Sequence, residues 1–177
     1  MTAGLVFLLT TGLTSADQND SRLDELFFTI QQTDDAEVAN TAENKIWEIW
    51  IQHDDKQTQE RLAEGIAAMD GNPRKALSIF NKIIEDVPDF AEGWNKRATL
   101  YYLFGEHAAS VSDIEMTLVL EPRHFGALSG LGLVYMAENQ YVKAKAAFEA
   151  VLLIHPHSSG VRRNIESIDD YLSRNTI

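Results

Sequence analysis

A regular spacing of proline residues is the strongest constraint that this sequence places on its fold. Pro88, Pro122 and Pro156 follow one another at intervals of 34 residues. Counting back from each proline aligns residues of matching character, namely Ala76 with Ser110 and Ala144, Phe80 with Ile114 and Phe148, and Gly71 with Gly105 and Asn139. Self-similarity at such a period is the signature of repeat architectures, whose units bury their apolar faces by stacking. The sequence therefore predicts three stacked repeats.

Each repeat is predicted to consist of two amphipathic helices. In the last repeat, apolar residues recur at helical spacing in two separate stretches, residues 128–135 and 144–152. Between the two helices, Gly105 and Asn139 suit a left-handed backbone turn. Each proline ends a second helix, because proline lacks the amide hydrogen that a helix interior needs. The repeat unit is thus a helix hairpin.

The residues inside the repeats follow a recurring pattern. The last repeat contains Leu128, Leu131, Gly132, Tyr135, Tyr141, Ala144, Phe148 and Pro156. The middle repeat contains Trp94, Arg97, Ala98, Tyr101, Ile114 and Pro122. This pattern resembles the tetratricopeptide repeat (TPR) family, and the chain looks like a bacterial member of it. The resemblance implies an all-α fold, an α-α superhelix in which antiparallel helix hairpins form a solenoid that ends in a C-terminal capping helix.

The three repeats are assigned to residues 57–90, 91–124 and 125–158. The first repeat departs from the pattern, because Gly65 and the alanines after it fall one residue late against the turn at Gly71. The register of its first helix is therefore open by one residue.

Amphipathic segments flank the repeats on both sides. Residues 17–56 contain two helical patterns and are predicted to form a degenerate fourth hairpin that caps the N-terminal end of the stack. Within this hairpin, Trp47 and Trp50 share one helix face, either as core residues or as a stacking platform for a ligand. Residues 159–177 are predicted to form the C-terminal capping helix, because their apolar residues fall on one stripe opposite charged ones.

Residues 1–16 have the composition of an export signal. They contain no charged side chain, and their apolar stretch at residues 5–13 is too short to span a bilayer as a helix. Small residues at positions 14–16 precede a polar run that begins at Asp17. This arrangement predicts a signal peptide cleaved after Ala16 and a periplasmic location. The alternatives are an apolar arm that packs on the domain, and a cytoplasmic protein.

The charge and the cysteine content exclude several classes of function. The 177 residues carry a formal net charge of −12 and include no cysteine. Nucleic acids and anionic membrane surfaces are unsuitable partners, because both attract clustered Lys and Arg. Without cysteine, no disulfide, thiolate metal site or cysteine nucleophile can form. The acidity is concentrated in residues 17–64, which hold 13 acidic and 4 basic side chains, and it favours a solvated surface over steering of a basic partner.

No motif in the sequence indicates catalysis or a cofactor. The five histidines include no i, i+4 pair, which would place two metal ligands on one helix face. His155 and His157 form the one cluster, and a metal bound there would need further ligands from elsewhere. Phosphate-binding loops, nucleophile elbows and dinucleotide fingerprints are missing from the sequence. The chain is therefore predicted not to be an enzyme, with no catalytic residue, cofactor or metal site.

The resemblance implies a binding surface on the concave side of the superhelix. In the family, the first helices of successive hairpins line this side, where a peptide or partner segment binds. The matching positions expected to contact a partner are Asn95, Lys96, Thr99, Tyr102, Ser129, Leu133 and Met136. Family members that grip a C-terminal carboxylate use an array of Lys, Arg and Asn, and only Asn95 and Lys96 match it. A segment with apolar anchors fits better, although neighbouring helices that cover some of these positions are the alternative.

These features predict a non-catalytic protein-protein interaction module that binds a partner segment in a preformed groove in the periplasm. Its partner is predicted to be a protein or peptide segment, with no nucleic acid and no stable membrane insertion once the leader is removed. Two hypotheses compete with this one: a cytoplasmic scaffold or chaperone-like adaptor, and a structural subunit that self-assembles.

Overall fold

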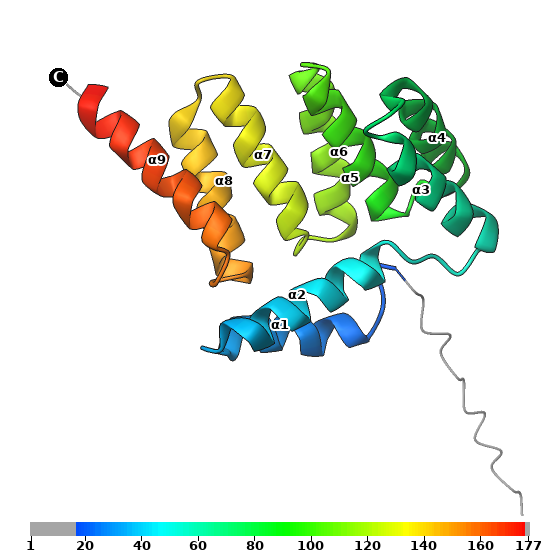
Figure 1. The fold of residues 1–177 in the computed structure, drawn as a ribbon, viewed down its shortest axis with the longest axis horizontal. Helices are drawn as coiled ribbons and strands as arrows, with labels where there is room; N and C mark the ends of the chain where they lie inside the picture. Colours follow the sequence, from blue (N-terminus) through cyan, green and yellow to red (C-terminus); the bar gives the residue numbers. More distant parts are fainter. Residues whose placement is uncertain (1–16, 176–177) are drawn as a thin grey trace, which may run out of the picture.

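The computed structural model describes residues 17–175, which form nine α-helices and no strand. The predicted leader, residues 1–16, lies outside the described residues. The helices are α1 (Arg22–Gln32), α2 (Ala36–Trp50), α3 (Lys56–Ala68), α4 (Pro73–Asp86), α5 (Ala91–Leu103), α6 (His107–Leu120), α7 (Phe125–Ala137), α8 (Tyr141–Ile154) and α9 (Ser159–Asn175). Helices α3 to α9 lie side by side as a curved stack, while α1 and α2 run across one edge of it (Figure 1). The predicted all-α superhelix is confirmed.

Short polar side chains define where several helices begin. The Asp35 carboxylate accepts hydrogen bonds from two backbone amides in the first turn of α2. Asp55 and Asn72 cap α3 and α4 in the same way, and Pro73 takes the first position of α4. These caps satisfy amides that have no partner within the helix. None of the described helices combines the length and the apolar character needed to cross a bilayer.

The turns inside the second and third repeats contain the predicted left-handed residues. Gly105 has a φ of 76° and Asn139 a φ of 58°. Gly71, which the alignment places in the same role, has no positive φ. The turn between α3 and α4 ends instead at Asn72, which caps the next helix directly. The first repeat therefore changes direction by a different turn from the other two.

Small residues let the two helices of a hairpin cross closely. A Cβ atom at Gly132 in α7 would lie 2.5 Å from Cε1 of Phe148 in α8. A Cβ atom at Gly65 in α3 would likewise lie 2.5 Å from Cε1 of Phe80 in α4. Real side chains do not approach this closely, so both crossings rely on glycine. Gly65 takes the crossing position one residue after the strict 34-residue period would place it, which settles the register of α3.

Helix α9 covers the last repeat. It packs against α8 through the buried residues Val161 and Ile168, with Ile165 and Leu172 partly buried beside them. Its outward face carries charged residues such as Arg163. The stack therefore ends in a polar surface at its C-terminal side.

The N-terminal hairpin, formed by α1 and α2, is a hairpin as predicted, but its predicted position as a cap on the N-terminal end of the stack is wrong. Its buried residues Phe27, Ile46 and Trp50 share one hydrophobic core with Phe125 of α7 and Phe148 of α8. The outward face of α3 offers no comparable surface, because it consists of polar residues and alanine. The exposed residues of that face are Lys56, Gln57, Glu60, Ala63, Glu64 and Ala67. The first repeat needs no cap, so the hairpin packs where large apolar side chains are available.

Candidate partner-binding groove

The N-terminal hairpin and the residues just before it contact all three turns that carry the repeat prolines. At the turn after α4, the Gln18 side chain donates to the Asp89 carbonyl oxygen at 2.6 Å and accepts from the Ala91 amide at 3.3 Å. At the turn after α6, Arg123 pairs with Asp24 at 2.7 Å. The hairpin that supplies these contacts runs along one edge of the superhelix, below the other helices (Figure 1).

The turn after α8 is held by a histidine and a carboxylate. His155 Nε2 donates to Glu43 Oε2 of α2 at 3.0 Å, because a carboxylate can only accept. This hydrogen bond is the main reason why the pKa of Glu43 lies below its usual value. The hairpin thus bridges the second and third repeats, with an ion pair to the turn at Arg123 and this hydrogen bond to the turn at His155.

The two tryptophans of α2 fill the lower part of the concave side. Trp50 is 1% exposed and stacks on the His124 ring, with a centroid distance of 4.0 Å and an interplanar angle of 10°. Trp47 lies over the start of α7, where a Cβ atom at Gly126 would fall 2.3 Å from Trp47 Cη2. Trp50 is therefore a core residue, as one of the two hypotheses held. Trp47 covers the start of α7 at Gly126, which would otherwise form part of the exposed concave surface.

A buried polar network lies beneath these tryptophans. His124 Nδ1 accepts the Ala127 amide at 3.0 Å, so its Nε2 carries the proton and donates to Glu92 Oε2 at 3.1 Å. Asn95 Nδ2 donates to the same oxygen at 2.9 Å, and Lys96 Nζ lies 2.7 Å from Glu92 Oε1. The Glu92 carboxylate thereby interacts with three side chains, those of His124, Asn95 and Lys96, in a site that is buried from solvent.

The surroundings of Glu92 keep it ionised. Burial by itself acts to raise its pKa, but the Lys96 ammonium and the His124 hydrogen bond outweigh burial and lower the pKa from 4.5 to about 2. Lys96 also lies 5.6 Å above the centroid of the Trp47 ring. The Lys96 ammonium thus forms an ion pair with Glu92 and a cation-π contact with Trp47, both of which belong to this chain.

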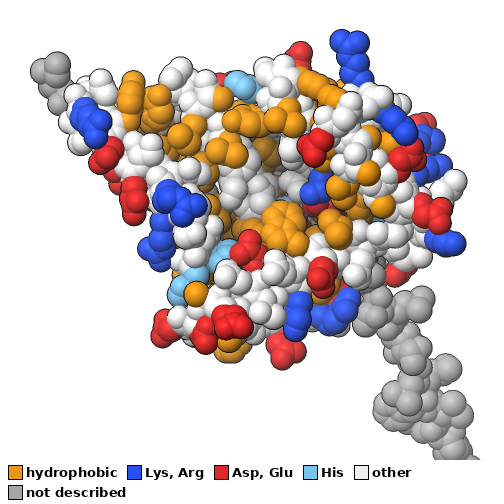
Figure 2. All heavy atoms as spheres, viewed as in Figure 1, with side chains coloured by type: hydrophobic (Ala, Val, Ile, Leu, Met, Phe, Trp, Pro, Cys, Tyr) orange, Lys and Arg blue, Asp and Glu red, His pale blue; other side chains and the backbone are white. Residues whose placement is uncertain are grey.

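A pocket opens between α5 and α7, next to the part covered by Trp47. It has a volume of about 180 Å³, and its walls include five of the seven residues predicted to contact a partner. These five are Asn95, Thr99, Tyr102, Ser129 and Leu133. The face shown in Figure 2 is hollowed near its centre, above the N-terminal hairpin, and hydrophobic side chains gather around the hollow.

The other two predicted contact residues lie outside this pocket. Lys96 is paired with Glu92, as described above. Met136 is partly buried and packs against the hydrophobic core that the N-terminal hairpin shares with α7 and α8. The N-terminal hairpin contributes to the core that covers Met136, whereas Lys96 is held by Glu92 of its own helix and lies over the Trp47 ring of the hairpin.

Sequence analysis missed the role of His124. It considered this residue only as one of five histidines without an i, i+4 partner, and gave it no role. The repeat alignment did contain a signal, because His124 stands 34 residues after Phe90, and both residues precede the first helix of a repeat. Phe90 is buried, so a histidine at the equivalent position is expected to be buried as well, and a buried ring nitrogen needs a partner.

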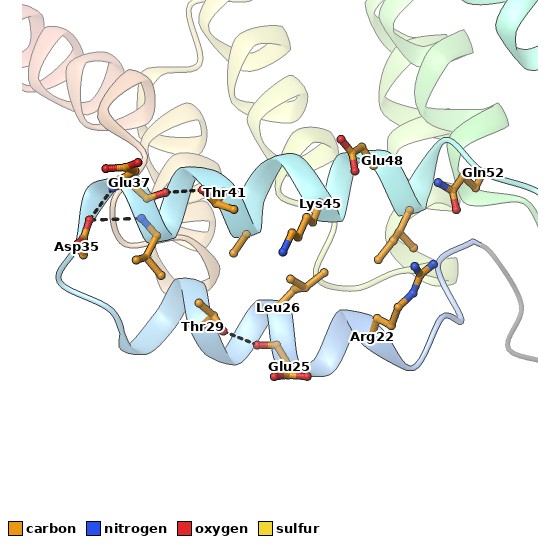
Figure 3. Close-up of a pocket in the computed structure, with 13 residues that line it drawn as sticks. Arg22, Glu25, Leu26, Thr29, Asp35, Glu37, Thr41, Lys45, Glu48 and Gln52 are labelled. Carbon is orange, nitrogen blue, oxygen red and sulfur yellow. Dashed lines mark hydrogen bonds between the residues drawn. The ribbon is translucent and has the colours of Figure 1, made fainter.

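A second, shallower groove runs along the outer side of the N-terminal hairpin. It has a volume of about 700 Å³ and lies between α1 and α2 (Figure 3). Leu26, Val38 and Ile49 supply apolar surface, and charged residues of both signs, such as Glu48 and Lys45, stand along it. None of the residues predicted to contact a partner lines this groove.

Comparison with known proteins gives the same family as the repeat pattern. The tetratricopeptide repeat family matches residues 127–158. A TPR repeat-containing protein of Rhizobium etli is 32% identical over 165 residues, which cover 87% of this chain and 76% of that protein.

Solved structures with the same architecture extend this likeness to the fold. The first TPR of Spaghetti (RPAP3), bound to the HSP90 peptide SRMEEVD, superposes with a TM-score of 0.64 at 21% identity, over 68% of this chain and 96% of that one. The MamA protein superposes with a TM-score of 0.59 at 20% identity, over 86% of this chain and 85% of that one. With its repeats, its helix hairpins and its relative in Rhizobium etli, this chain belongs to the tetratricopeptide repeat family.

Proposed function

We propose that this chain is a non-catalytic interaction module that binds a segment of a partner protein in the pocket between α5 and α7. One observation carries the proposal: five residues chosen by repeat position alone line a single open pocket. The pocket combines apolar walls with a few polar groups, which is the usual composition of a site for a peptide or small ligand. A structural neighbour, the first TPR of Spaghetti, is bound to an HSP90 peptide, and this supports peptide binding by the same architecture.

The mode of binding proposed for this chain is a preformed groove. The N-terminal hairpin ties the repeat turns together through Gln18, Arg123 and His155, so the curvature of the superhelix is fixed before any partner arrives. A rigid site loses less conformational entropy on binding than a flexible one. The partner is therefore expected to adapt to the groove, rather than the reverse.

We propose the periplasm as the place where the module acts. Support comes from the sequence of residues 1–16, which has the apolar stretch and the small residues of an export signal. The mass and N-terminal sequence of the protein isolated from its host test this. A chain that begins at Asp17 supports export, whereas one that begins at Met1 supports a cytoplasmic scaffold.

The binding proposal is tested with the double variant Tyr102→Asp/Leu133→Asp. Two carboxylates on the pocket wall would meet an apolar partner group without a hydrogen-bond partner, so retention of the partner should fall at least about tenfold. The measurement is a comparative pull-down from envelope and cytosolic fractions of the host, with mass spectrometry of the retained proteins. A protein lost from the variant in one fraction identifies both the partner and the compartment.

A matched control has the same residue types away from the pocket. Leu153→Asp/Tyr171→Asp places the two carboxylates on α8 and α9, where Leu153 is 80% exposed and Tyr171 is 45% exposed. This control should retain the same proteins as the unmodified chain. If both double variants retain the same proteins, the pocket between α5 and α7 is not the binding site. If the unmodified chain retains nothing and elutes as an oligomer, the self-assembling subunit is the better hypothesis.

A further inference from the structure

The charges around the pocket define what kind of segment it can bind. Resting on the proposed function, we infer that the pocket between α5 and α7 takes an uncharged apolar side chain from within a partner segment, and that it does not hold a chain-terminal carboxylate. None of the residues that line the pocket is Lys, Arg, His, Asp or Glu. A carboxylate placed there would lose its water and gain no cation.

Lys96 follows the lining residue Asn95 on α5, and its charge is already neutralised. Its ammonium is paired with the Glu92 carboxylate, which is 1% exposed and cannot turn to another partner. A carboxylate ligand that captured Lys96 would leave Glu92 buried with an unbalanced charge. The buried pair therefore works against carboxylate capture, even though Asn95 and Lys96 match the residue types used for it.

The walls of the pocket favour an apolar side chain. Ala98, Ile114 and Ala127 belong to one hydrophobic cluster and also line the pocket. Two of the hydroxyl groups that line the pocket are satisfied within the chain, because Thr99 donates to the Asn95 carbonyl oxygen and Ser110 to the Ala98 carbonyl oxygen. An apolar group that enters this space displaces water from apolar walls, with which water forms few favourable interactions.

The Asn95 side chain offers an acceptor to a peptide backbone. The Asn95 amide must point its Nδ2 at Glu92, since a carboxylate only accepts hydrogen bonds. Its Oδ1 is then left with no donor among the residues that the structure describes, and it is not sealed from solvent. It can accept a backbone amide of a segment that inserts its side chain beside it. An amide of this kind is available anywhere along a chain and does not require a chain end.

The chain itself provides an example of the same contact. Gly126 lines the pocket, and Trp47 of α2 packs against Gly126 without lining the pocket itself. An apolar residue from the N-terminal hairpin thus already occupies the adjoining part of the concave side. A partner segment that enters the pocket continues this row of apolar contacts beyond Trp47.

The test uses two libraries of short random peptides displayed on phage. In one library both ends of the peptide are joined to coat protein, and in the other the C-terminus is free. The full chain is the bait. We expect peptides to be enriched from the internal library, with an apolar residue at a fixed position and no preference for a terminal carboxylate.

Variants of Gly130 then test whether the selected peptides use this pocket. A Cβ atom at Gly130 would lie 3.6 Å from Ile114 Cδ1, so Gly130→Ala fits, whereas Gly130→Leu fills the space between α5 and α7. Gly130→Leu should weaken binding of the selected peptides at least about tenfold, and Gly130→Ala, which adds a single carbon, should weaken it less. Leu133→Lys, at the exposed rim, is a second variant that should weaken binding and does not depend on repacking of the pocket floor.

The possible failures can be told apart. Enrichment confined to the free C-terminus library, with binding lost in both Lys96→Ala and Gly130→Leu, would overturn the inference and leave the proposed function standing. Selected peptides that bind Gly130→Leu and Leu133→Lys as well as the unmodified chain would overturn the choice of pocket. No enrichment from either library would overturn the proposed function, and the inference with it.

Discussion

The two ends of this chain both add amphipathic helices to the repeats, and they attach in different ways. Helix α9 continues the stack, with Val161 and Ile168 packed on the last hairpin and a charged face turned outward. The N-terminal hairpin leaves the stack and crosses its edge, where Trp50 reaches His124 and Phe125. The difference shows that an amphipathic pattern fixes which face is buried, while the neighbouring apolar surface decides where the helix packs.

The two ends also have different consequences for binding. Helix α9 leaves the concave side of the repeats untouched. The N-terminal hairpin covers its lower part with Trp47, and under the proposed function this leaves the pocket beyond Gly126 for a partner. If this comparison is right, substitutions in the N-terminal hairpin should change both the free energy of unfolding and partner binding in the pocket. Substitutions in α9 should change the free energy of unfolding alone.

The largest effect is expected from Trp50→Ala. This side chain is fully buried between Phe27, His124 and Phe125, so its removal leaves a cavity and should lower the free energy of unfolding by about 3–5 kcal/mol. Chemical denaturation followed by circular dichroism measures it. Tyr171→Ala in α9 removes an exposed aromatic ring and should cost about 1 kcal/mol or less. Equal losses in the two variants would show that the hairpin is attached no more firmly than α9.

The next largest effect is expected from Glu92→Gln, which removes the buried charge between Lys96 and His124. The amide retains the shape but not the charge, so at neutral pH the variant should lose about 2 kcal/mol of stability.

The same residue gives a prediction for acid. The folded-state pKa of Glu92 lies below its unfolded value, so its contribution is present above pH 4.5 and is lost as the pH falls from 4.5 towards about 2. The stabilities of the unmodified chain and of Glu92→Gln should therefore converge over this range. Denaturation curves at a series of pH values measure the gap, and a constant gap would contradict the role given to the charge.

Two glycine substitutions in α7 should change the free energy of unfolding by smaller amounts and in opposite directions. Gly126→Ala places a Cβ atom against Trp47 and should destabilise the chain by about 1–2 kcal/mol. Gly130→Ala, one turn later, meets Ile114 Cδ1 at an ordinary van der Waals distance of 3.6 Å and should stabilise by up to about 1 kcal/mol, because alanine favours the helix. Thermal melting of the two variants compares them directly. A stabilised Gly126→Ala variant would mean that Trp47 does not rest on α7.

The sequence predicts features that depend on local, repeating patterns, and it does not predict features that depend on contacts between distant residues. The repeats could be predicted because the pattern of Ala98, Gly132 and the prolines is local and recurs at a fixed period. The pocket walls could be predicted for the same reason, since Thr99 and Leu133 occupy equivalent positions in successive repeats. The crossing of the hairpin depends on contacts between residues far apart in the chain, such as Glu43 with His155, and no period relates them. His124 was missed because its partner Glu92 lies 32 residues earlier in the chain, at no repeat-equivalent position, and its stacking partner Trp50 lies in the hairpin.

The smallest changes in stability are expected when one polar contact is removed at each end of the chain. Glu43 of the hairpin pairs with His155 and is about one-third exposed, so Glu43→Gln should cost about 1 kcal/mol or less at neutral pH. Asp169 of α9 pairs with Lys145 and is half exposed, and Asp169→Asn should leave the melting temperature unchanged within error. Because the His155 hydrogen bond holds the pKa of Glu43 below its usual 4.5, the cost of Glu43→Gln should shrink as the pH falls below 4.5. Hydrogen exchange adds local resolution: amides of α1 and α2 should exchange faster in Glu43→Gln, and those of α9 should not. If the amides of α9 respond instead, His155 stabilises the end of the stack rather than the crossing of the hairpin.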